Sequence, residues 1–563
     1  MSETADTPRK VADRYVRELA DLDPSVNTAL GLDPDCDGLP DLSPDGLAAE
    51  AELGRRTLQA LRGLGPDAVA DDLERRCATL LAERVGSDLA VHESGEDLRA
   101  LRNIFSPVHA VRQLFMMMPT ETDHEWEVIG RRVARVPLAY RQFIERLEEG
   151  HRRGMYAAPR QVRTVVAQLG EWLSGERPWF QGFVASAPDG LADRLQPEGR
   201  AADEAVAEVR DYLANTYLPR AEGTPDAVGA DRYAIGVRAS TGAQMDGAQL
   251  RSAYEWGWQE YLRIAEEMRR EAERVLPGAS PVEAMRYLDQ HGEAVEGVEQ
   301  IRERLQQLMD QAIVDLDGKH FDLAEPVRKV EAMIAPPGSA AAPYYTRPSL
   351  DFSRPGRTWL PTMGQTRFPL WGLISTWYHE GVPGHHLQLG QWAYVAPQLS
   401  MFQTTIGSVS ATTEGWALYA ERLMDELGYM AQPGPRLGYL DAQMLRAVRV
   451  VIDIGMHLQL QVPADSPIAP GERWNHDLGR EFLRAHSGSE DAFIDSEVIR
   501  YLGWPGQAIS YKLGERAWLA GREEARRRHL ARDGEFDLKA WHMAALSLGA
   551  LGLDDLTTEL AAL

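Results

Sequence analysis

The sequence predicts a mainly α-helical fold with at most a small β-sheet. Helical periodicity dominates the chain, and Val298, Ile301, Leu305 and Leu308 show it with a 3,4,3 spacing that places one apolar stripe on a helix. Strand patterns are sparse by comparison. The chain has 563 residues, of which 44% are hydrophobic, so it can bury a sizeable core. We therefore expect a large multi-helix protein.

One break in the helical pattern divides the chain. Residues 335–343 read APPGSAAAP, a run of small residues and prolines that is typical of a surface connection. We take residues 1–335 as an N-terminal helical half and residues 336–563 as the half that carries the histidine cluster described below. Both halves are expected to wall one cleft and to form one continuous body.

The best strand candidate is residues 357–360 (RTWL), shortly before the histidine cluster. It suits an edge strand that pairs with an extended peptide through backbone hydrogen bonds, and a plain loop is the alternative. Any small sheet is therefore expected near the cluster.

The composition argues against several classes of partner. The formal net charge is −25, whereas binding a phosphate backbone needs clusters of Lys and Arg. The two cysteines, Cys36 and Cys77, are too few for a disulfide framework or a thiolate zinc site. The N-terminus has no apolar signal region, and no stretch approaches the roughly 20 apolar residues of a membrane helix. We expect a cytoplasmic protein with neither nucleic acid nor membrane as partner, and no oligomeric state is predicted.

The most specific pattern lies in residues 373–388, LISTWYHEGVPGHHLQ. In an HExxH helix, two histidines one turn apart bind zinc, and the glutamate between them activates a water molecule. Here His379 and Glu380 begin such a motif, but Pro383 stands one turn after His379 and cannot bind a metal. The second ligand must therefore come from further along.

Two residues can supply that second imidazole. In an unbroken helix His385 would point about 120° away from His379. Pro383 and Gly384, however, can interrupt the helix with a two-residue bulge that returns His385 to the metal. His386 comes back to the face of His379 after nearly two turns, but about 10 Å of rise strains chelation of one ion. We predict His385 as the ligand and keep His386 as the alternative.

A second helix, TTEGWALYAE, offers the third ligand. Glu414, Leu418 and Glu421 are four and three residues apart and share one face. Glu414 is predicted to bind the metal, and Gly415 is expected to remove bulk beside it. Glu421 either accepts a hydrogen bond from a ligating imidazole or is a solvated acid on the helix surface.

These motifs resemble a bacterial family named as domain of unknown function 885, a group with gluzincin-type metallopeptidase character. The resemblance rests on HEGVPGHHLQ followed by EGWALYAE. Further similar segments span nearly the whole chain: residues 23–43 (DPSVNTALGLDPDCDGLPDLS), residues 343–362 (PYYTRPSLDFSRPGRTWLPT), residues 445–457 (LRAVRVVIDIGMH), residues 500–515 (RYLGWPGQAISYKLGE) and the tail ALSLGALGLDDL.

More distantly, the pattern resembles carboxypeptidase Taq and the neurolysin-type oligopeptidases. In their motif a glycine directly precedes the second histidine, as Gly384 precedes His385 here. The resemblance implies a mostly helical, zincin-like metallopeptidase fold with a deep cleft, and it supports His385 as the ligand.

A hydrolase of this kind needs a group that stabilises the oxyanion of the tetrahedral intermediate. Tyr511, Tyr501 and His457 are the candidates. We predict Tyr511, because GQAISYKLG resembles the tyrosine-bearing segment that covers the cleft in neurolysin-type enzymes. Tyr501 and His457 have the alternative interpretation of a buried aromatic residue and a core histidine.

Several basic side chains can bind a substrate carboxylate, which would favour a carboxypeptidase or dipeptidase over an endopeptidase. Each can instead pair with an acid of the chain such as Asp453 or Glu497, and such a helix-surface ion pair is the default. These basic residues are Arg446, Arg449, Arg500 and Lys512.

The sequence thus predicts a zinc metallopeptidase that acts on short peptides or peptide-like molecules. One Zn²⁺ is expected on His379, His385 and Glu414, with Glu380 as general base; Mn²⁺ or Fe²⁺ suits the same ligands. Two alternatives stay open. One is a zincin-fold enzyme that tailors a non-peptide metabolite, and the other is a non-catalytic binding protein whose metal site has degenerated.

Overall fold

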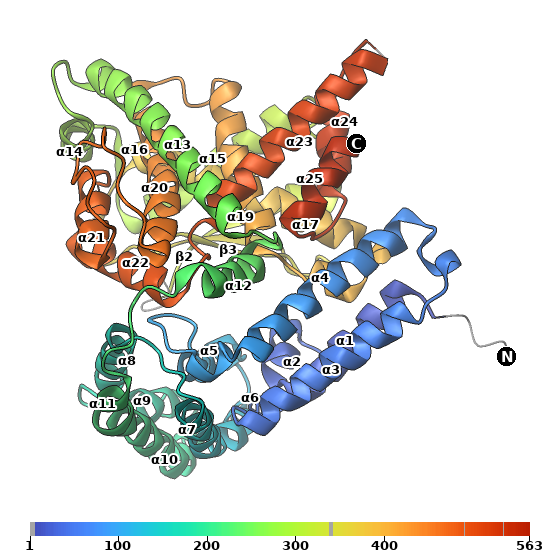
Figure 1. Ribbon diagram of the computed structural model, residues 1–563, viewed down its shortest axis with the longest axis vertical. Helices are drawn as coiled ribbons and strands as arrows, with labels where there is room; N and C mark the ends of the chain where they lie inside the picture. The colour runs from blue at the N-terminus through green and yellow to red at the C-terminus, as the bar shows by residue number, and fades with distance from the viewer. Residues whose placement is uncertain (1–5, 337–341, 489, 533) are drawn as a thin grey trace. The chain divides into compact units, whose positions relative to one another are not determined.

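The computed structural model describes residues 6–336, 342–488, 490–532 and 534–563, and Figure 1 shows that helices make up most of it. The chain forms two compact units. The first comprises Met1–Glu74, Arg84–Val228 and Ser496–Trp504, and the second comprises Arg75–Glu83, Gly229–Asp495 and Pro505–Leu563. The mainly helical prediction is confirmed.

The main division falls after Val228 and not near Ala335, where the sequence led us to place it. The physical reason is packing, because α13 (Gly247–Val275) lies against α20 (Pro433–Leu458) and so joins the half that carries the histidines. Residues 337–341 of the predicted break lie outside the described residues.

In the described part of the first unit, the regular structure is helical. α4 (Asp72–Ser94) and α22 (Asp491–Gly503) each contribute residues to both units. The remaining helices of the first unit are α1 (Pro8–Leu22), α2 (Pro24–Leu30), α3 (Pro44–Arg62), α5 (Pro107–Met117), α6 (Asp123–Val133), α7 (Val136–Arg152), α8 (Pro159–Trp172), α9 (Trp179–Val184), α10 (Leu191–Tyr212) and α11 (Leu218–Ala221).

The second unit combines helices with short strands. Its other helices are α12 (Gly229–Thr241), α14 (Pro281–His291), α15 (Val298–Leu316), α16 (Leu370–Glu380), α17 (His385–Val395), α18 (Met401–Thr404), α19 (Ser410–Glu426), α21 (His476–Ala485), α23 (Ser510–Arg532), α24 (Leu538–Leu546) and α25 (Leu553–Ala562). Its strands are β1 (Ala294–Glu296), β2 (Val330–Ile334), β3 (Tyr344–Thr346), β4 (Gly356–Leu360) and β5 (Arg367–Pro369).

Local sequence explains where several helices begin. α14 starts with Pro281 after Ser280, whose hydroxyl accepts from the backbone N–H of Glu283 while the Glu283 carboxylate accepts from Ser280. This capping box satisfies amides that have no partner inside the helix. Asp246 and Gln249 form the same arrangement at the start of α13.

The periodic segment used for the fold prediction is α15. Ile301 and Leu305 are fully buried as expected, whereas Leu308 is only partly buried and Met309 takes the next core position. The buried stripe therefore repeats every four residues, a spacing that keeps one face of the helix towards the core.

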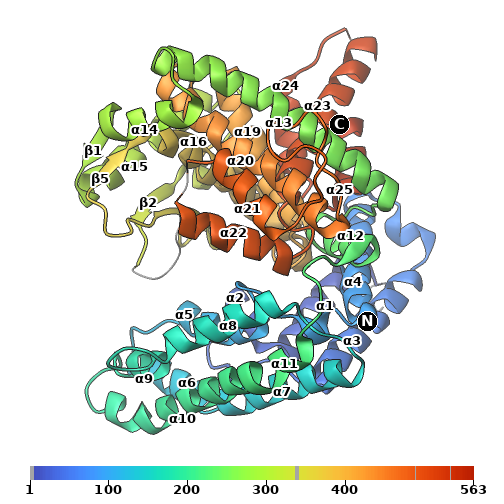
Figure 2. The same cartoon turned by 60° about the vertical axis from the view of Figure 1, so that its left-hand side comes forward.

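Residues 357–360 do form a strand, but it is not an edge. β4 is the central strand of a three-stranded sheet, with β2 parallel on one side and β3 antiparallel on the other. Both rows of its backbone hydrogen-bonding groups are therefore used, so β4 cannot add a peptide as proposed from the sequence. β1 and β5 form a separate antiparallel pair near α14 and α15 (Figure 2).

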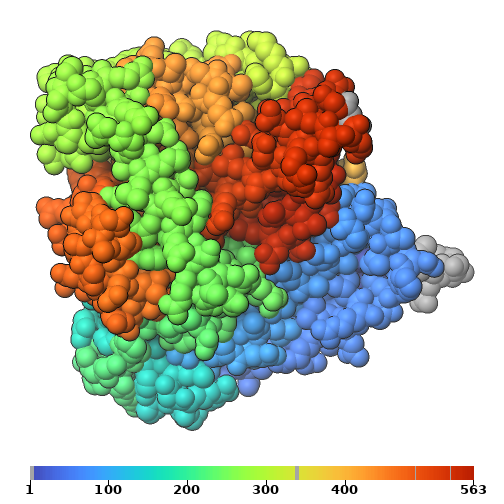
Figure 3. Space-filling view, turned by 45° about the horizontal axis from the view of Figure 1, so that its top comes forward, coloured from blue at the N-terminus to red at the C-terminus, as the bar shows by residue number. Residues whose placement is uncertain are grey.

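Four helices of the second unit carry most of the predicted site residues, while His385 lies on α17 and Tyr501 on α22. α16 packs on α19 and α20, and α19 packs on α23. Figure 3 shows the green segment that includes α13 on the surface between the orange segment that includes α21 and the red C-terminal helices. α13 packs on α20. Within the described residues no helix is both long and apolar enough to cross a membrane.

Candidate metal centre

The helix that carries His379 ends one residue later, inside the histidine motif. α16 ends at Glu380, and α17 starts at His385. The intervening residues turn sharply through a cis peptide bond between Val382 and Pro383. The carbonyls of Pro383 and Gly384 both accept from the indole N–H of Trp416, at 2.9 and 3.1 Å, so the break leaves these groups satisfied.

Gly384 is required by this turn. A Cβ atom at this position would lie only 1.9 Å from the carbonyl oxygen of His379 and 2.4 Å from that of Tyr378. No side chain fits between those two carbonyls, and backbone cannot give way as a flexible side chain would. The Pro-Gly pair thus folds the chain back onto the end of α16 and sets the start of α17 beside it.

Three of the predicted ligand residues come together. The candidate ligand atoms of His379, His385 and Glu414 all lie within 4.8 Å of one another. Oε2 of Glu414 lies 3.3 Å from Nε2 of His379 and 3.6 Å from Nε2 of His385. The two imidazole rings stand nearly perpendicular, at 85°, with centroids 4.8 Å apart. The metal cluster, as we call these three residues, joins α16, α17 and α19.

The donor atoms of the metal cluster fit a small cation. Ligands of a tetrahedral zinc ion with bonds of about 2.1 Å are about 3.4 Å apart, close to the two nitrogen–oxygen distances found here. Oε2 of Glu414 is buried, yet it accepts no hydrogen bond from the described part of the chain. A buried carboxylate oxygen without a donor calls for a partner, and a cation between the three residues provides one.

Charge within the metal cluster favours an anionic carboxylate. Burial raises the pKa of Glu414, but the imidazoles of His385 and His379 outweigh it and hold that pKa below its usual range. Burial disfavours a charged imidazole, yet the carboxylates of Glu414 and Glu421 raise the pKa of His379 to about 10. A metal ion at this site would therefore have to displace a proton from the same nitrogen.

Glu421 contacts the ring nitrogen of His379 that does not face Glu414. Its Oε1 lies 2.8 Å from Nδ1 of His379, and its Oε2 accepts from the hydroxyl of Ser375 at 2.5 Å. Glu421 is 0% exposed, so the interpretation as a solvated surface acid is wrong. Sequence reasoning missed Ser375, although its position four residues before His379 places it on the same helix face.

His386 does not join the metal cluster. Its Nε2 donates to the carbonyl of Val327 at 2.7 Å, and its Nδ1 lies 2.9 Å from the hydroxyl of Tyr345 on β3. Both ring nitrogens are thereby engaged, and burial lowers the pKa of His386 to about 4. His386 instead ties α17 to the sheet and to the turn that contains Val327.

Glu380 is buried next to His379 at the end of α16. Burial raises its pKa, and the charges of His379, His385 and Arg446 act against that rise. Its carboxylate makes no hydrogen bond or ion pair with the described residues. It is thus free to exchange a proton with a molecule bound at the metal cluster.

Tyr511 lies at the start of α23, which runs beside α19 in the same direction. The hydroxyls of Ser410 and Ser510 are 3.1 Å apart at the start of the two helices. Tyr511 is therefore level with the first turn of α19, about one turn before Glu414. The guanidinium of Arg449 stacks on its ring at 4.9 Å from the centroid.

Gly415 has a different role from the expected one. A Cβ atom on Gly415 would lie 2.4 Å from the backbone of Gly514, so this residue allows α19 and α23 to approach closely. Gly415 directly follows Glu414 in the chain. The close approach of α19 and α23 at Gly415 therefore helps to set the distance between α23 and the metal cluster.

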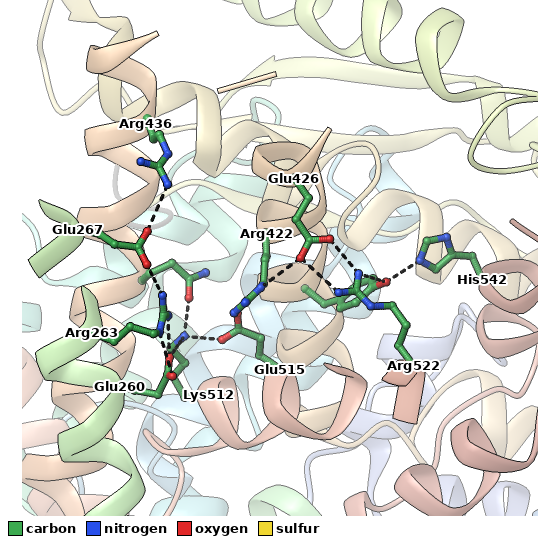
Figure 4. A network of polar contacts seen from close by, with 12 residues as sticks. Glu260, Arg263, Glu267, Arg422, Glu426, Arg436, Lys512, Glu515, Arg522 and His542 are labelled. Atoms are coloured by element: carbon green, nitrogen blue, oxygen red, sulfur yellow. Dashed lines mark hydrogen bonds and ion pairs between the residues drawn. The ribbon is translucent and has the colours of Figure 1, made fainter. Parts of the chain in front are cut away.

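Lys512 is not available to a substrate. It is 0% exposed, and its ammonium donates to Gln443 at 2.6 Å and to Glu515 at 2.5 Å, with Glu260 at 3.6 Å. Figure 4 shows Lys512 inside a network that extends through Glu515 and Arg422 towards Arg522. The expectation of substrate binding by Lys512 is wrong because the network already neutralises its charge.

The two remaining candidates for the oxyanion have structural roles. His457 is buried, with Nε2 3.5 Å from Asp453 and its ring against Tyr233. Tyr501 belongs to the first unit, where its buried hydroxyl donates to Glu497 at 2.8 Å. Both fit the alternative interpretation as core residues.

Comparison with known proteins gives a family but no activity. No curated protein matches the chain. A crystal structure of a "putative lipoprotein" from Colwellia psychrerythraea is similar over 99% of this chain and 98% of its own, with a TM-score of 0.84 and 20% identity. A "putative lipoprotein of unknown function" from Shewanella oneidensis is similar over 99% of this chain and 100% of its own, with a TM-score of 0.73 and 17% identity. At these identities the likeness establishes the fold alone.

A family model described as "Bacterial protein of unknown function (DUF885)" matches residues 24–560. The match covers almost the whole chain, including α16, α17 and α19 with the metal cluster. The chain therefore belongs to the DUF885 family of bacterial proteins.

Proposed function

We propose that this chain is a metal-dependent hydrolase that cleaves amide bonds in peptides or peptide-like molecules. The observation that carries the proposal is the convergence of His379, His385 and Glu414 within 4.8 Å. Glu380 directly follows His379, and its carboxylate has no hydrogen bond or ion pair within the described residues. Two imidazoles and one carboxylate are the protein ligands of many catalytic zinc sites, in which one position stays open.

Zinc is the metal that we propose, with manganese or iron as alternatives for the same nitrogen and oxygen donors. Bound there, it supplies a Lewis acid that makes water nucleophilic near neutral pH and polarises the scissile carbonyl. His379, His385 and Glu414 would hold it, and Glu421 and Ser375 would fix the ring of His379.

Glu380 is the proposed general base and acid. Its carboxylate accepts a proton from the attacking water as the new carbon–oxygen bond forms. It then passes that proton to the amide nitrogen while the carbon–nitrogen bond breaks, so the leaving group departs as a neutral amine. The burial of Glu380 suits this double role, because it raises the pKa of the carboxyl above its ordinary value and so favours the protonated form that the second step needs.

Tyr511 is the proposed donor to the oxyanion. A phenol hydroxyl donates a hydrogen bond without bringing a charge of its own, which suits a group that develops negative charge only in the transition state. Its place at the start of α23, level with the start of α19, supports this assignment. The stacked guanidinium of Arg449 restricts the orientation of its ring.

The choice of peptides as substrates rests on the resemblance to gluzincin-type metallopeptidases. A zincin-like fold with a deep substrate cleft is part of the same proposal.

For the cellular location we keep the cytoplasm as the prediction. A lipid-modified form is the alternative, because both similar structures are described as lipoproteins. Fractionation of cells that express the full chain, followed by mass measurement of the protein, distinguishes these two.

The proposal is tested with the purified full chain loaded with one equivalent of zinc. We expect hydrolysis of members of a panel of dipeptides and N-acetylated tripeptides. The Glu380→Gln variant should lose at least about 100-fold in kcat while it retains its zinc. Glu426→Gln, an exposed substitution on α19, is the matched control and should keep full activity. A zinc-loaded wild type that hydrolyses none of these peptides, or an active Glu380→Gln variant, would contradict the proposal.

A further inference from the structure

Among the described residues, Arg446 has guanidinium N–H groups that the protein itself does not pair. Of the basic residues that the sequence offered for carboxylate binding, Lys512 is neutralised by Glu515, and Arg449 is buried against Tyr511. Arg500 pairs with Glu497 at 2.8 Å within the first unit. Arg446 remains.

Arg446 lies level with the end of α16. Gly438 of α20 touches the backbone of Trp371 near the start of α16, where a Cβ on Gly438 would lie 2.0 Å from the Trp371 carbonyl. On α20, Arg446 comes after Gly438; on α16, Glu380 comes after Trp371 by almost the same number of residues. Each separation corresponds to about 12 Å along the helix axis.

The two helices run in the same direction from that contact. Trp371 and Asp441 line one cavity near the start of α16, and further along the charge of Arg446 acts on Glu380. The same order of contacts on both helices requires a parallel arrangement. The backbone of Arg446 therefore lies level with Glu380, and the charge of its guanidinium acts on the Glu380 carboxyl.

The guanidinium of Arg446 has N–H donors that no described residue accepts. Its only hydrogen bond to the described residues runs from Nη1 to the carbonyl of Ala442 on its own helix, at 3.1 Å. Its Nε is buried and has no acceptor. Neither Asp441 nor Glu380 forms an ion pair with it, although its charge acts on both. An arginine carries five N–H donors in a planar fork, and a carboxylate accepts two of them side by side.

We propose that Arg446 binds a free carboxylate of the substrate. The bond that is cleaved then lies next to a C-terminal residue, so the substrates are peptides or N-acylated amino acids with a free C-terminal carboxylate. This inference rests on the proposed hydrolase activity and deepens it. It makes Arg446 a specificity-determining residue, since the guanidinium selects the acid over the corresponding amide.

The test uses matched peptide pairs that differ only in the C-terminal group. Ala-Phe and its amide, and the N-acetylated forms of both, are titrated by calorimetry into the zinc-loaded full chain carrying Glu380→Gln, which should bind the peptides but not cleave them. We expect at least one acid to bind about 10- to 100-fold more tightly than its amide, the range of a charge-assisted hydrogen-bonded pair.

In the same background, Arg446→Met should bring the acid-to-amide affinity ratio close to 1, and Arg446→Lys should retain part of it. Arg436→Met is the matched control, because Arg436 lies on the same helix but is paired with Glu267 and Asp425, and this variant should keep the ratio. Two outcomes would overturn the inference. One is equal binding, or no binding, of acids and amides by the protein with Arg446 intact; the other is an Arg446→Met variant that keeps the ratio.

The inference and the proposed function fail in different ways. Turnover of the same pairs by the zinc-loaded wild type tests the proposed function, whereas the affinity ratio does not depend on turnover. Selective acid binding without hydrolysis would support Arg446 and contradict the hydrolase. Hydrolysis of acids and amides with the same KM would support the hydrolase and contradict the role of Arg446.

Discussion

Glu421 and His379 are joined by a hydrogen bond of 2.8 Å between Oε1 and Nδ1, which links the middle of α19 to the last turn of α16. The carboxylate accepts from Nδ1–H, and so a metal that displaces the second ring proton would find the lone pair of the imidazole on Nε2, which faces Glu414. This arrangement fixes both the tautomer and the orientation of the ring, and it increases the basicity of Nε2. The side chain proposed as the first metal ligand is therefore oriented by the protein alone.

Weakening that support should weaken metal binding. We expect Glu421→Gln to lower the affinity for zinc about 10- to 100-fold, because the neutral amide no longer polarises His379. Competition with a chromogenic chelator measures the affinity. Glu426→Gln, on the same helix but at the surface, should leave it unchanged. Equal zinc affinities of the Glu421→Gln variant and the wild type would show that this hydrogen bond does not strengthen metal binding by His379.

His385 and His386 should separate metal binding from stability. His385→Ala should lose stoichiometric zinc, measured by mass spectrometry of the metal, with a small effect on the fold. His386→Ala should retain zinc but lower the free energy of unfolding by about 2–4 kcal/mol, because the carbonyl of Val327 and the hydroxyl of Tyr345 lose a buried partner. Loss of zinc in His386→Ala alone would reverse our choice of ligand.

The buried neutral His386 should make stability depend on pH. Burial lowers its pKa to about 4 in the folded chain, whereas an unfolded histidine titrates near 6.5. Between these values the unfolded chain binds more protons, so the free energy of unfolding falls as the pH drops from 6.5 to 4. The contribution amounts to about 3 kcal/mol.

Urea unfolding of wild type and His386→Gln over this pH range measures the effect, and both proteins should be compared with zinc removed. The Gln variant lacks the titrating group, and its stability should fall less steeply than that of the wild type. Parallel curves for the two proteins would mean that His386 is not held neutral in the fold.

Gly384 should tolerate no side chain. We expect Gly384→Ala to lower the free energy of unfolding by about 3 kcal/mol or more and to reduce zinc binding, because the new Cβ atom would meet the carbonyls of His379 and Tyr378. Gly372→Ala is the matched control in α16, since its Cβ atom would meet nothing within 4 Å. That change should be neutral or stabilise by up to about 1 kcal/mol. Thermal unfolding and zinc titration of both variants check this, and a normal site in Gly384→Ala would contradict it.

The sequence was informative where spacing and residue chemistry determine the outcome. The helical fold followed from periodicity, and the return of His385 towards His379 followed from the Pro-Gly pair, because few other turns are open to such a dipeptide. Sequence reasoning also anticipated a strand at residues 357–360.

What the sequence could not predict depends on contacts between distant segments. The central position of β4 depends on β2 and β3, and the role of Gly415 depends on Gly514, about a hundred residues later. The burial of Lys512 depends on Gln443 and Glu515 together. A single sequence shows which side chains are charged, but it does not show which of them the folded chain has already paired.

The central claim is that His379, His385 and Glu414 bind one catalytic metal ion. The most direct measurement is an anomalous difference map at the zinc absorption edge from crystals of the zinc-loaded full chain. The account predicts one strong peak per chain, about 2.1 Å from Nε2 of His379, Nε2 of His385 and a carboxylate oxygen of Glu414. A map without a peak among these three side chains, in a protein that has been offered zinc, would contradict it.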